Sequence, residues 1–236
     1  MLSFKDTEIG FKEKLFTIPT LELENGKIYS LIGKNGSGKS TFFQSLLGLT
    51  PFLSGKIRFD NLDLSTINQL EKAKLIAFVA SKFDGVQHLS GRDYILMGRS
   101  PYTNFLGKHT ENDFQLVDLI IQELKIEHLA QKDTLKMSDG ERQILSIAKA
   151  LAQECKIILL DEPSAFLDYA NRIKVLTLLN SIVKEKNMCV IQSSHDLELC
   201  LEYSSSFLVI DNKSKVLIEL ENKLLRKEKL IDLAFD

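Results

Sequence analysis

A glycine-rich stretch between two apolar runs constrains this chain more than any other feature. Residues 33–41 read Gly-Lys-Asn-Gly-Ser-Gly-Lys-Ser-Thr and match the pattern G-x-x-x-x-G-K-[S/T]. The run 28–32 before the stretch is typical of a buried strand, and residues 42–47 after it have helical character. Strand, glycine-rich loop and helix in this order predict a loop whose backbone N–H groups, together with the start of the helix, cradle phosphate groups.

The polar residues of this loop indicate ATP and Mg²⁺ as its ligands. Lys39 is expected to reach the β- and γ-phosphates, Ser40 to coordinate Mg²⁺ and Thr41 to lie near the α-phosphate. The alternative is a chance glycine-rich turn, which should match these fixed positions in about 1% of chains of this length. We therefore expect ATP contacts along the whole loop, from Gly33, Asn35, Gly36, Ser37, Gly38, Lys39, Ser40 and Thr41.

Two further apolar runs end in residues that suit phosphate chemistry. The run 157–160 ends in Asp161 and Glu162, and the run 190–194 is followed by His195. Ligands of open parallel sheets bind at the carboxyl ends of strands. We expect Asp161 to hold Mg²⁺ opposite Ser40, Glu162 to act as general base on the attacking water, and His195 to hydrogen-bond the γ-phosphate. Alone, these features would indicate structural strand ends. After a phosphate loop, they indicate catalysis.

The remaining patterns predict an α/β fold with a mostly parallel sheet, because strand and helix patterns alternate along the chain. Short strands are expected in the first thirty residues and at 56–59, and together they predict an N-terminal antiparallel β subdomain. Residues 65–149 have a mostly helical pattern. The later elements are strands at 156–160 and 188–192, helices at 113–124, 141–152, 171–184 and 196–202, and a hairpin of 207–210 with 216–219. We expect one domain, 1–236, with a core of roughly 1–80 and 151–236 and an inserted helical lobe of roughly 82–150.

Composition narrows the classes of partner and compartment. The formal net charge of −2 gives no general attraction to nucleic acid, so none is expected as a partner. Cys155, Cys189 and Cys200 are odd in number and widely spaced, which favours reduced thiols in a cytoplasmic protein. The first six residues lack the pattern of a signal peptide, and the run 157–160 is too short to cross a bilayer.

Taken together, these motifs resemble the ATP-binding cassette (ABC) ATPase family over nearly the whole chain. Residues 136–143, Lys-Met-Ser-Asp-Gly-Glu-Arg-Gln, are similar to the family's L-S-G-G-Q signature followed by R-Q. The resemblance implies the ABC ATPase fold and a homodimer that holds two ATP molecules between its subunits. Ser138, Gly140 and Glu141 would then contact the ATP held by the other subunit. Ser138 and Glu141 also have the spacing of a helix capping box, and both interpretations can hold.

The resemblance implies further roles. Asp168 corresponds to the acidic residue of the family's dimer-contact loop, and Phe11, with Phe16 as second candidate, to the aromatic residue that stacks on adenine. Residues 98–102, Gly-Arg-Ser-Pro-Tyr, are similar to the G-R-x-P segment of ATPases that serve importers of ferric siderophores, haem and cobalamin. Such an ATPase docks on a polytopic membrane permease, at the cytoplasmic face of the membrane, with a substrate-binding protein upstream.

The chain departs from the family pattern at four positions. Met137, Asp139 and Glu141 replace the usual Leu, Gly and Gln of the signature. Ser81 occupies the place of the Gln that links the core to the helical lobe, and Gln87 lies nearby but out of register. These departures put turnover and coupling in doubt. Two alternatives therefore stand beside import: a cassette ATPase that serves an exporter or a soluble complex, and a slowly hydrolysing switch that dimerises on ATP.

Overall fold

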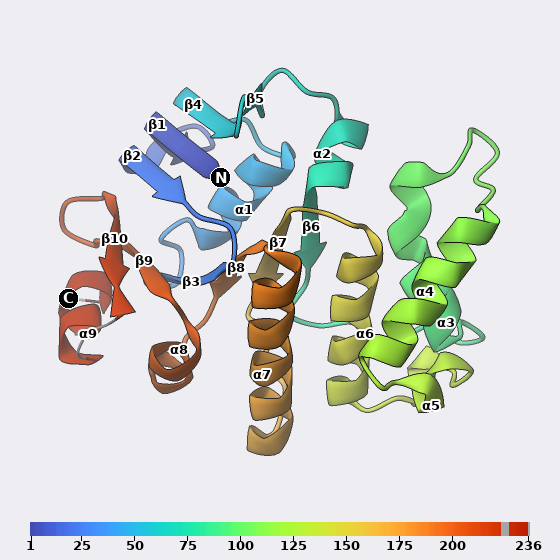
Figure 1. The fold of residues 1–236 in the computed structure, drawn as a ribbon. Coiled ribbons are helices and arrows are strands. Elements are labelled where there is room, and N and C mark those ends of the chain that lie inside the picture. The colour runs from blue at the N-terminus through green and yellow to red at the C-terminus, as the bar shows by residue number, and fades with distance from the viewer. Residues whose placement is uncertain (223–226, 236) are drawn as a thin grey trace.

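The computed structural model describes residues 1–222 and 227–235, whose strands form two sheets (Figure 1). The N-terminal sheet is antiparallel, with the strand order β2-β1-β4-β5. This sheet is the predicted N-terminal antiparallel β subdomain. Its strands are β1 (Leu2–Gly10), β2 (Lys14–Leu23), β4 (Ser54–Phe59) and β5 (Leu62–Asp63).

The second sheet has the strand order β10-β9-β3-β8-β7-β6. Every neighbouring pair from β9 to β6 is parallel, and only β10 runs antiparallel to its neighbour β9. The mostly parallel sheet predicted from the alternation of elements is thus confirmed. Its strands are β3 (Lys27–Ile32), β6 (Ile76–Val79), β7 (Ile157–Asp161), β8 (Cys189–Ser193), β9 (Ser206–Ile210) and β10 (Leu217–Glu221).

Helices connect these strands and cover the second sheet. None of those in the described part of the chain combines the length and apolar character that a membrane crossing requires. The helices are α1 (Lys39–Leu47), α2 (Gln69–Leu75), α3 (Gly91–Leu96), α4 (Glu111–Glu123), α5 (Glu127–Ala130), α6 (Asp139–Ala152), α7 (Tyr169–Lys186), α8 (Leu197–Tyr203) and α9 (Lys227–Phe235), with 3₁₀ turns η1 (Met97–Tyr102) and η2 (Thr134–Lys136).

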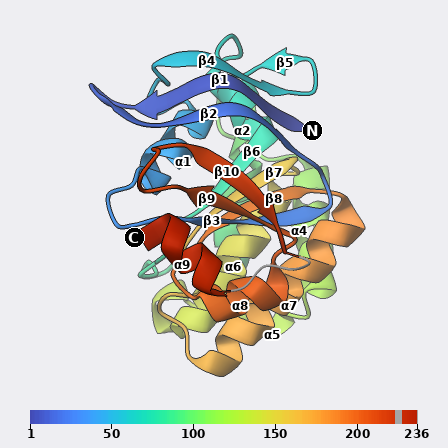
Figure 2. The same ribbon diagram turned by 90° about the vertical axis from the view of Figure 1, so that its left-hand side faces the viewer.

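The elements form three layers (Figure 2). The antiparallel sheet lies above the six-stranded sheet, with α1 packed between them, and α6, α7 and α8 lie below. Figure 1 shows α3, α4 and α5 to one side, beyond α6. One apolar cluster fills the space around α1, and a second joins the lower face of the six-stranded sheet to α3, α4, α6 and α7. The sheet is therefore buried on both faces.

This burial explains why the central strands are apolar throughout. Along β7, Ile157 and Leu159 point into the cluster around α1, whereas Ile158 and Leu160 point into the helical cluster. Each residue of the run is nearly inaccessible to solvent, so neither face selects for polar side chains. Polar side chains are accommodated only where the strand leaves this buried region, at the carboxyl end of the run.

One expectation about the elements is wrong, and one omits a strand. The first two strands are not short, since β1 has 9 residues and β2 has 10. Asp6 interrupts the apolar alternation of β1 because it has a left-handed conformation (φ 46°), beside which the register with β4 shifts. The mostly helical stretch 65–149 also contains the strand β6. Ile76 is both the C-cap of α2 and the first residue of β6, so no glycine or proline marks the change.

Candidate active site

The glycine-rich loop connects β3 to α1, as its pattern predicts, and holds Lys39 beneath it. The Lys39 ammonium donates to the backbone carbonyl oxygens of Gly33 at 2.7 Å and Lys34 at 3.2 Å. Burial lowers the pKa of Lys39, while the carboxylates of Glu162 and Asp161 act in the opposite direction. A buried cation that is paired with neutral carbonyls is suited to an incoming polyanion.

The shape of this loop requires glycine where the backbone adopts left-handed conformations. Gly36 has φ 76°, and Gly38, the N-cap of α1, has φ 107°. A Cβ on Gly38 would also lie 3.0 Å from the Phe16 ring. The glycines therefore allow the loop to turn tightly so that its N–H groups and the start of α1 can face one ligand.

A cavity of about 230 Å³ lies over the loop. It has the donors and acceptors that a triphosphate with its metal ion needs: backbone N–H groups, an ammonium, two hydroxyls and two carboxylates. The Ser37 hydroxyl is buried and has no hydrogen-bond partner among the described residues, so this loop also holds an unused polar group. The lining residues are Leu15, Asn35, Gly36, Gly38, Lys39, Ser40, Thr41, Asp161 and Glu162. Gly33 and Ser37 are absent from this lining and pack against each other.

The ends of β7 and β8 bring the acidic residues and His195 together. Asp161 and Ser193 are register partners on these parallel strands. The Ser193 hydroxyl donates to Asp161 Oδ1 at 2.7 Å and accepts from the Glu162 backbone N–H at 2.9 Å. His195 Nε2 lies 3.0 Å from Glu162 Oε1. Glu162 has φ 47°, a conformation that is uncommon for a residue with a side chain.

Ser193 is a functional candidate that the sequence reasoning missed. The sequence pattern places it within an apolar run, two residues before His195. Its position at the carboxyl end of a strand neighbouring β7 was the signal that could have identified it. That signal becomes specific only when the strand order is known, because β7 and β8 are separated by α7 along the chain.

Glu162 and His195 also line a second cavity, of about 530 Å³. It shares Glu162 with the lining of the phosphate cavity, and its own lining includes Arg172, Asp196 and Lys227. Arg172 pairs with Asp196 at 3.2 Å, so the wall of the cavity is ordered by an ion pair. The Glu162 side chain is therefore accessible from both cavities.

The signature segment begins α6, at a distance from the phosphate cavity of its own chain. Ser138 is the N-cap and forms the predicted capping box with Glu141, whose carboxylate accepts from the Ser138 backbone N–H at 2.7 Å. The two extra carboxylates of this signature are paired: Glu141 binds Lys132 at 2.8 Å and Asp139 binds Arg142. Burial tends to raise the pKa of Glu141, but the hydrogen bonds from Lys132 and Ser138 lower it overall.

The segment around Asp168, expected to contact a second subunit, touches the signature segment within the same chain. Asp168 is the N-cap of α7, and its carboxylate accepts from the backbone and the side chain of Asn171. The Asn171 side chain packs on Gly140, where an added Cβ would lie 2.9 Å from it. Asp168 and the signature glycine are thus connected through one asparagine. None of Ser138, Gly140, Glu141 or Asp168 lines the phosphate cavity described above.

The structure separates three residues that the sequence left ambiguous. Phe11 is 70% exposed in the turn between β1 and β2, whereas Phe16 is fully buried against Phe42. Of the two candidates for adenine stacking, Phe11 is the accessible one. Ser81 follows β6 and lines a small cavity with Asp139 and Arg142 rather than the phosphate cavity.

Comparison with known proteins assigns the family. Residues 17–165, more than half of the chain, match the sequence profile of the family described as ABC transporter. The chain belongs to this family. Its fold agrees, because the structure matches a solved ABC transporter assigned to the metal-chelate type with a TM-score of 0.83 at 32% sequence identity. This match covers 98% of the chain and 88% of the solved chain.

Curated relatives of the chain are ATP-binding proteins of ABC transporters. The molybdate import ATP-binding protein MolC of Haemophilus influenzae is 34% identical over 210 residues, which are 89% of this chain and 78% of MolC. The petrobactin import ATP-binding protein FpuC of Bacillus anthracis is 32% identical over 190 residues, which are 80% of this chain and 70% of FpuC. The chain is therefore an ATP-binding subunit of an ABC transporter, with an ATPase domain.

Proposed function

We propose that this ABC ATPase powers the import of a metal chelate, namely a ferric siderophore, haem or cobalamin. The observation that carries its chemistry is the meeting of Lys39, Asp161, Glu162 and His195 at the carboxyl edge of β3, β7 and β8. Relatives named for the import of petrobactin and molybdate, and the likeness to a transporter of the metal-chelate type, support the direction and the class of cargo.

Catalysis in this proposal is mainly positioning and electrostatics. Lys39 and the loop N–H groups offset the charge of the β- and γ-phosphates. Glu162 accepts a proton from the attacking water, and His195, 3.0 Å from Glu162, orients that carboxylate and the γ-phosphate. Ser40 and Asp161 would hold Mg²⁺, which supplies additional positive charge to the phosphate oxygens when bound. The Ser193 hydroxyl keeps Asp161 in place for this role.

The working form in this proposal is a homodimer with two ATP molecules between the subunits. The phosphate loop and Phe11 of one subunit hold the nucleotide, and Ser138, Gly140 and Glu141 of the other subunit approach its γ-phosphate. Ser138 and the start of α6 suit this contact because a helix N-terminus attracts anions. Residues 82–150 would act as the lobe that carries these groups, with Asp168 at the contact between the subunits.

The partner in this proposal is a polytopic permease that holds the dimer at the cytoplasmic face of the membrane, with a substrate-binding protein on the opposite side. The test is ATP hydrolysis in liposomes that contain the chain and the permease with which it co-purifies. Addition of the binding protein loaded with a ferric chelate, haem or cobalamin should stimulate hydrolysis. Stimulation by molybdate alone would redirect the proposal to oxyanion import, and no stimulation by any cargo would overturn it.

A slowly hydrolysing switch is the second candidate, and Ser81 is the observation that favours it. The Ser81 side chain is shorter than glutamine by about two bonds and lines a cavity other than that of the phosphate loop. Single-turnover hydrolysis by the purified chain separates the two candidates. A switch would retain bound ATP over many minutes with Glu162 intact, whereas the ATPase would release phosphate.

A further inference from the structure

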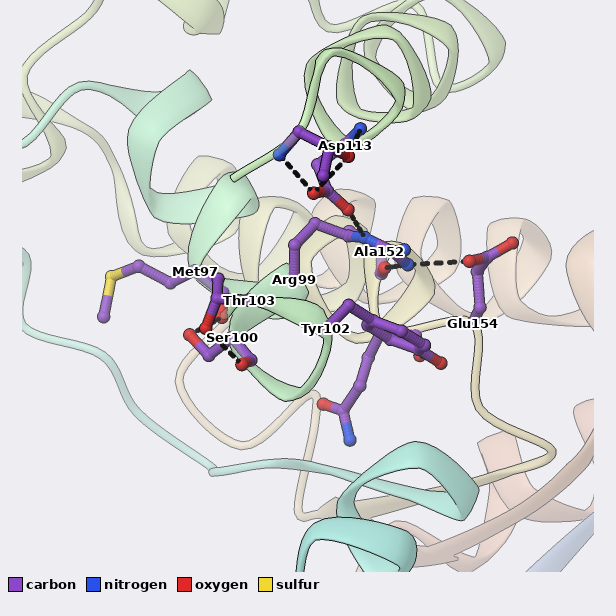
Figure 3. Close-up of polar contacts among 10 residues, drawn as sticks. Met97, Arg99, Ser100, Tyr102, Thr103, Asp113, Ala152 and Glu154 are labelled. Carbon is purple, nitrogen blue, oxygen red and sulfur yellow. Dashed lines mark hydrogen bonds and ion pairs between the residues drawn. The ribbon is translucent and has the colours of Figure 1, made fainter. Parts of the chain in front are cut away.

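Residues 98–102, whose pattern the proposed chemistry does not use, contact the end of α6 through Arg99 and Tyr102 (Figure 3). They lie in η1, between α3 and the loop that leads to α4. We call Gly98, Arg99 and Tyr102, together with the residues they contact, the Arg99 clamp.

Arg99 is the centre of the clamp and is buried, with 7% of its surface exposed. Its guanidinium donates to Asp113 Oδ1, to the Ala152 carbonyl oxygen and to Glu154 Oε2, each at 2.7 Å. It also lies over the Tyr102 ring, 3.9 Å from the ring centroid. Figure 3 shows these groups converging on the guanidinium from η1, α4 and the end of α6. An arginine is needed here because no other side chain offers a planar fork of donors.

The other residues of the clamp hold the same end of α6. A Cβ on Gly98 would lie 2.2 Å from the Lys149 carbonyl oxygen, so glycine permits η1 to approach the last turn. The Tyr102 hydroxyl donates to the Gln153 carbonyl oxygen at 3.0 Å. The Gln153 amide in turn donates to the carbonyl oxygens of Ala73 and Ile76, where α2 meets β6. The carbonyl oxygens of Ala152 and Gln153 thus tie the end of α6 to η1, and the Gln153 side chain ties it to the junction of α2 and β6.

The opposite end of α6 begins with Ser138, the residue proposed to contact the ATP of the other subunit. The 14 residues of α6 form one rigid rod about 20 Å long. Apolar side chains such as Leu145, Ile147 and Ala148 anchor its middle. A rod that is held in the middle moves at both ends when one end is released. A shift of about 1 Å at Ala152 would therefore be matched by a similar shift at Ser138, which is enough to cost about a hundredfold in a site that depends on geometry.

We propose that Arg99 is a positioning residue that sets the angle of α6 and thereby places Ser138 against the ATP held by the partner subunit. This inference rests on the proposed function, in which Ser138 acts across a dimer. The clamp shares no residue with the lining of the phosphate cavity, so Arg99 should have no effect on nucleotide binding within its own subunit. Arg99 acts only on the later step, in which the signature of one subunit contacts the ATP held by the other.

The first test measures ATP affinity and ATP-dependent dimerisation separately in the Glu162→Gln background, where ATP persists. Arg99→Met should keep the ATP affinity of the monomer within about twofold and weaken dimerisation by at least about tenfold. The matched control is Arg92→Met, since Arg92 pairs with Asp118 through two hydrogen bonds between α3 and α4, and its hydrogen bonds, ion pair and ring contact in the described structure go to α4. The control should dimerise like its parent. Equal dimerisation by Arg99→Met and the parent would overturn the inference.

The second test asks in which subunit Arg99 acts. Lys39→Ala chains cannot bind ATP in their own phosphate loop but keep an intact signature and an intact Arg99 clamp. Arg99→Met chains keep an intact phosphate loop. A mixed pair of the two therefore contains one complete composite site, which neither variant can form alone. Mixed pairs should retain ATP at least about tenfold longer than Arg99→Met chains alone. No recovery on mixing would mean that Arg99 acts within its own subunit, and would overturn the inference.

Removal of Arg99 leaves Asp113 buried without its cation, which can unfold the lobe. Two milder variants guard against this outcome. Arg99→Met with Asp113→Leu removes both charges, and Tyr102→Phe deletes only the hydroxyl that caps α6. Both variants should dimerise less tightly, in proportion to the contacts they lose. The smaller loss of dimer affinity, about threefold, is expected for Tyr102→Phe. A folded double variant with parental dimerisation would refute the positioning role. A parent that fails to dimerise with ATP would instead refute the proposed function itself.

Discussion

The Ser193 hydroxyl donates a hydrogen bond of 2.7 Å to the Asp161 carboxylate across the ends of β7 and β8. The same oxygen accepts a hydrogen bond from the backbone N–H of Glu162, a residue with a left-handed backbone conformation. One hydroxyl thus fixes both acidic residues proposed for the metal ion and the attacking water. Groups that orient a metal ligand in this way typically contribute a factor of about 10 to 100 to metal affinity.

Ser193→Ala should therefore raise the Mg²⁺ concentration needed for half-maximal hydrolysis by at least about tenfold. It should also destabilise the fold by about 1 to 3 kcal/mol, because the Glu162 N–H loses its acceptor. Phosphate release as a function of Mg²⁺ concentration, with urea unfolding, measures both effects. Ser45→Ala is the control, since the buried Ser45 hydroxyl has no partner among the described residues and its loss should be neutral. An unchanged Mg²⁺ requirement in Ser193→Ala would argue against Asp161 as a ligand.

Lys39→Ala should abolish most ATP affinity without unfolding the chain. Among the described residues the Lys39 ammonium hydrogen-bonds to carbonyl oxygens alone, and burial opposes its charge, so its removal costs the nucleotide-free fold little. At an ATP concentration of 100 times the Kd, the parent should gain about 2.7 kcal/mol, or about 5 to 10 °C in melting temperature. The variant should show no such gain at the same concentration. If ATP raised the melting temperature of Lys39→Ala as much as that of the parent, ATP would bind elsewhere.

Glu162→Gln should bind MgATP, hydrolyse it at least about a hundredfold more slowly and accumulate as an ATP-dependent dimer. The change keeps the shape of the side chain and removes the base, so the γ-phosphate stays and, in the proposed dimer, bridges the two subunits. Light scattering with and without MgATP reports the dimer. Glu185→Gln makes the same substitution at an exposed position of α7 and should remain a parental ATPase. A monomer at saturating MgATP would contradict the two-subunit site.

Ser81→Gln should leave ATP affinity unchanged and raise the hydrolysis rate of the isolated chain, or lower its Mg²⁺ requirement. A glutamine carbonyl extends about two bonds beyond the serine hydroxyl and is a suitable ligand for Mg²⁺ or water. Steady-state phosphate release against Mg²⁺ concentration is the measurement. Gln87→Ala serves as control, because Gln87 is exposed and should not substitute for residue 81. Superimposable curves for Ser81→Gln and the parent would place residue 81 beyond the reach of the metal.

Asp113→Asn should lower the free energy of unfolding at pH 7, and the deficit should shrink in acid. Burial raises the pKa of Asp113, but hydrogen bonds from Thr110 and Arg99 outweigh it and lower the pKa from 3.8 to about 2. Because the pKa of Asp113 is lower in the folded than in the unfolded state, its carboxylate stabilises the fold fully at pH values above the unfolded-state pKa. This contribution is lost as the pH falls through the folded-state pKa. The contribution is about 2 kcal/mol at pH 7 and about half of that at pH 3.

Urea unfolding of parent and variant at both pH values measures this difference. Asp118→Asn removes the exposed partner of Arg92 in the same lobe and should cost under about 1 kcal/mol at either pH. A deficit in Asp113→Asn that stays constant from pH 7 to pH 3 would show that the carboxylate charge is not what stabilises the Arg99 clamp.

Much of the fold and of the phosphate site was predictable because it depends on local patterns. The loop around Lys39, the buried strands and the long helices follow from glycine positions and apolar periodicity within short windows. The capping box of Ser138 and Glu141 was predictable for the same reason, since its residues lie three apart. The strand β6 was missed because Leu75 and Ile76 continue one apolar run across a helix-to-strand change.

Tertiary structure alone decided which distant residues meet. Ser193 faces Asp161 because β7 and β8 are neighbours in register, and no local pattern in the chain specifies that order. The exposure of Phe11 and burial of Phe16 likewise follow from how the N-terminal sheet packs on α1. Arg99 could be recognised as part of a motif, but its partners Asp113 and Glu154 come from other elements. Side-chain periodicity determines which face of an element is buried, whereas the packing of whole elements determines what that face contacts.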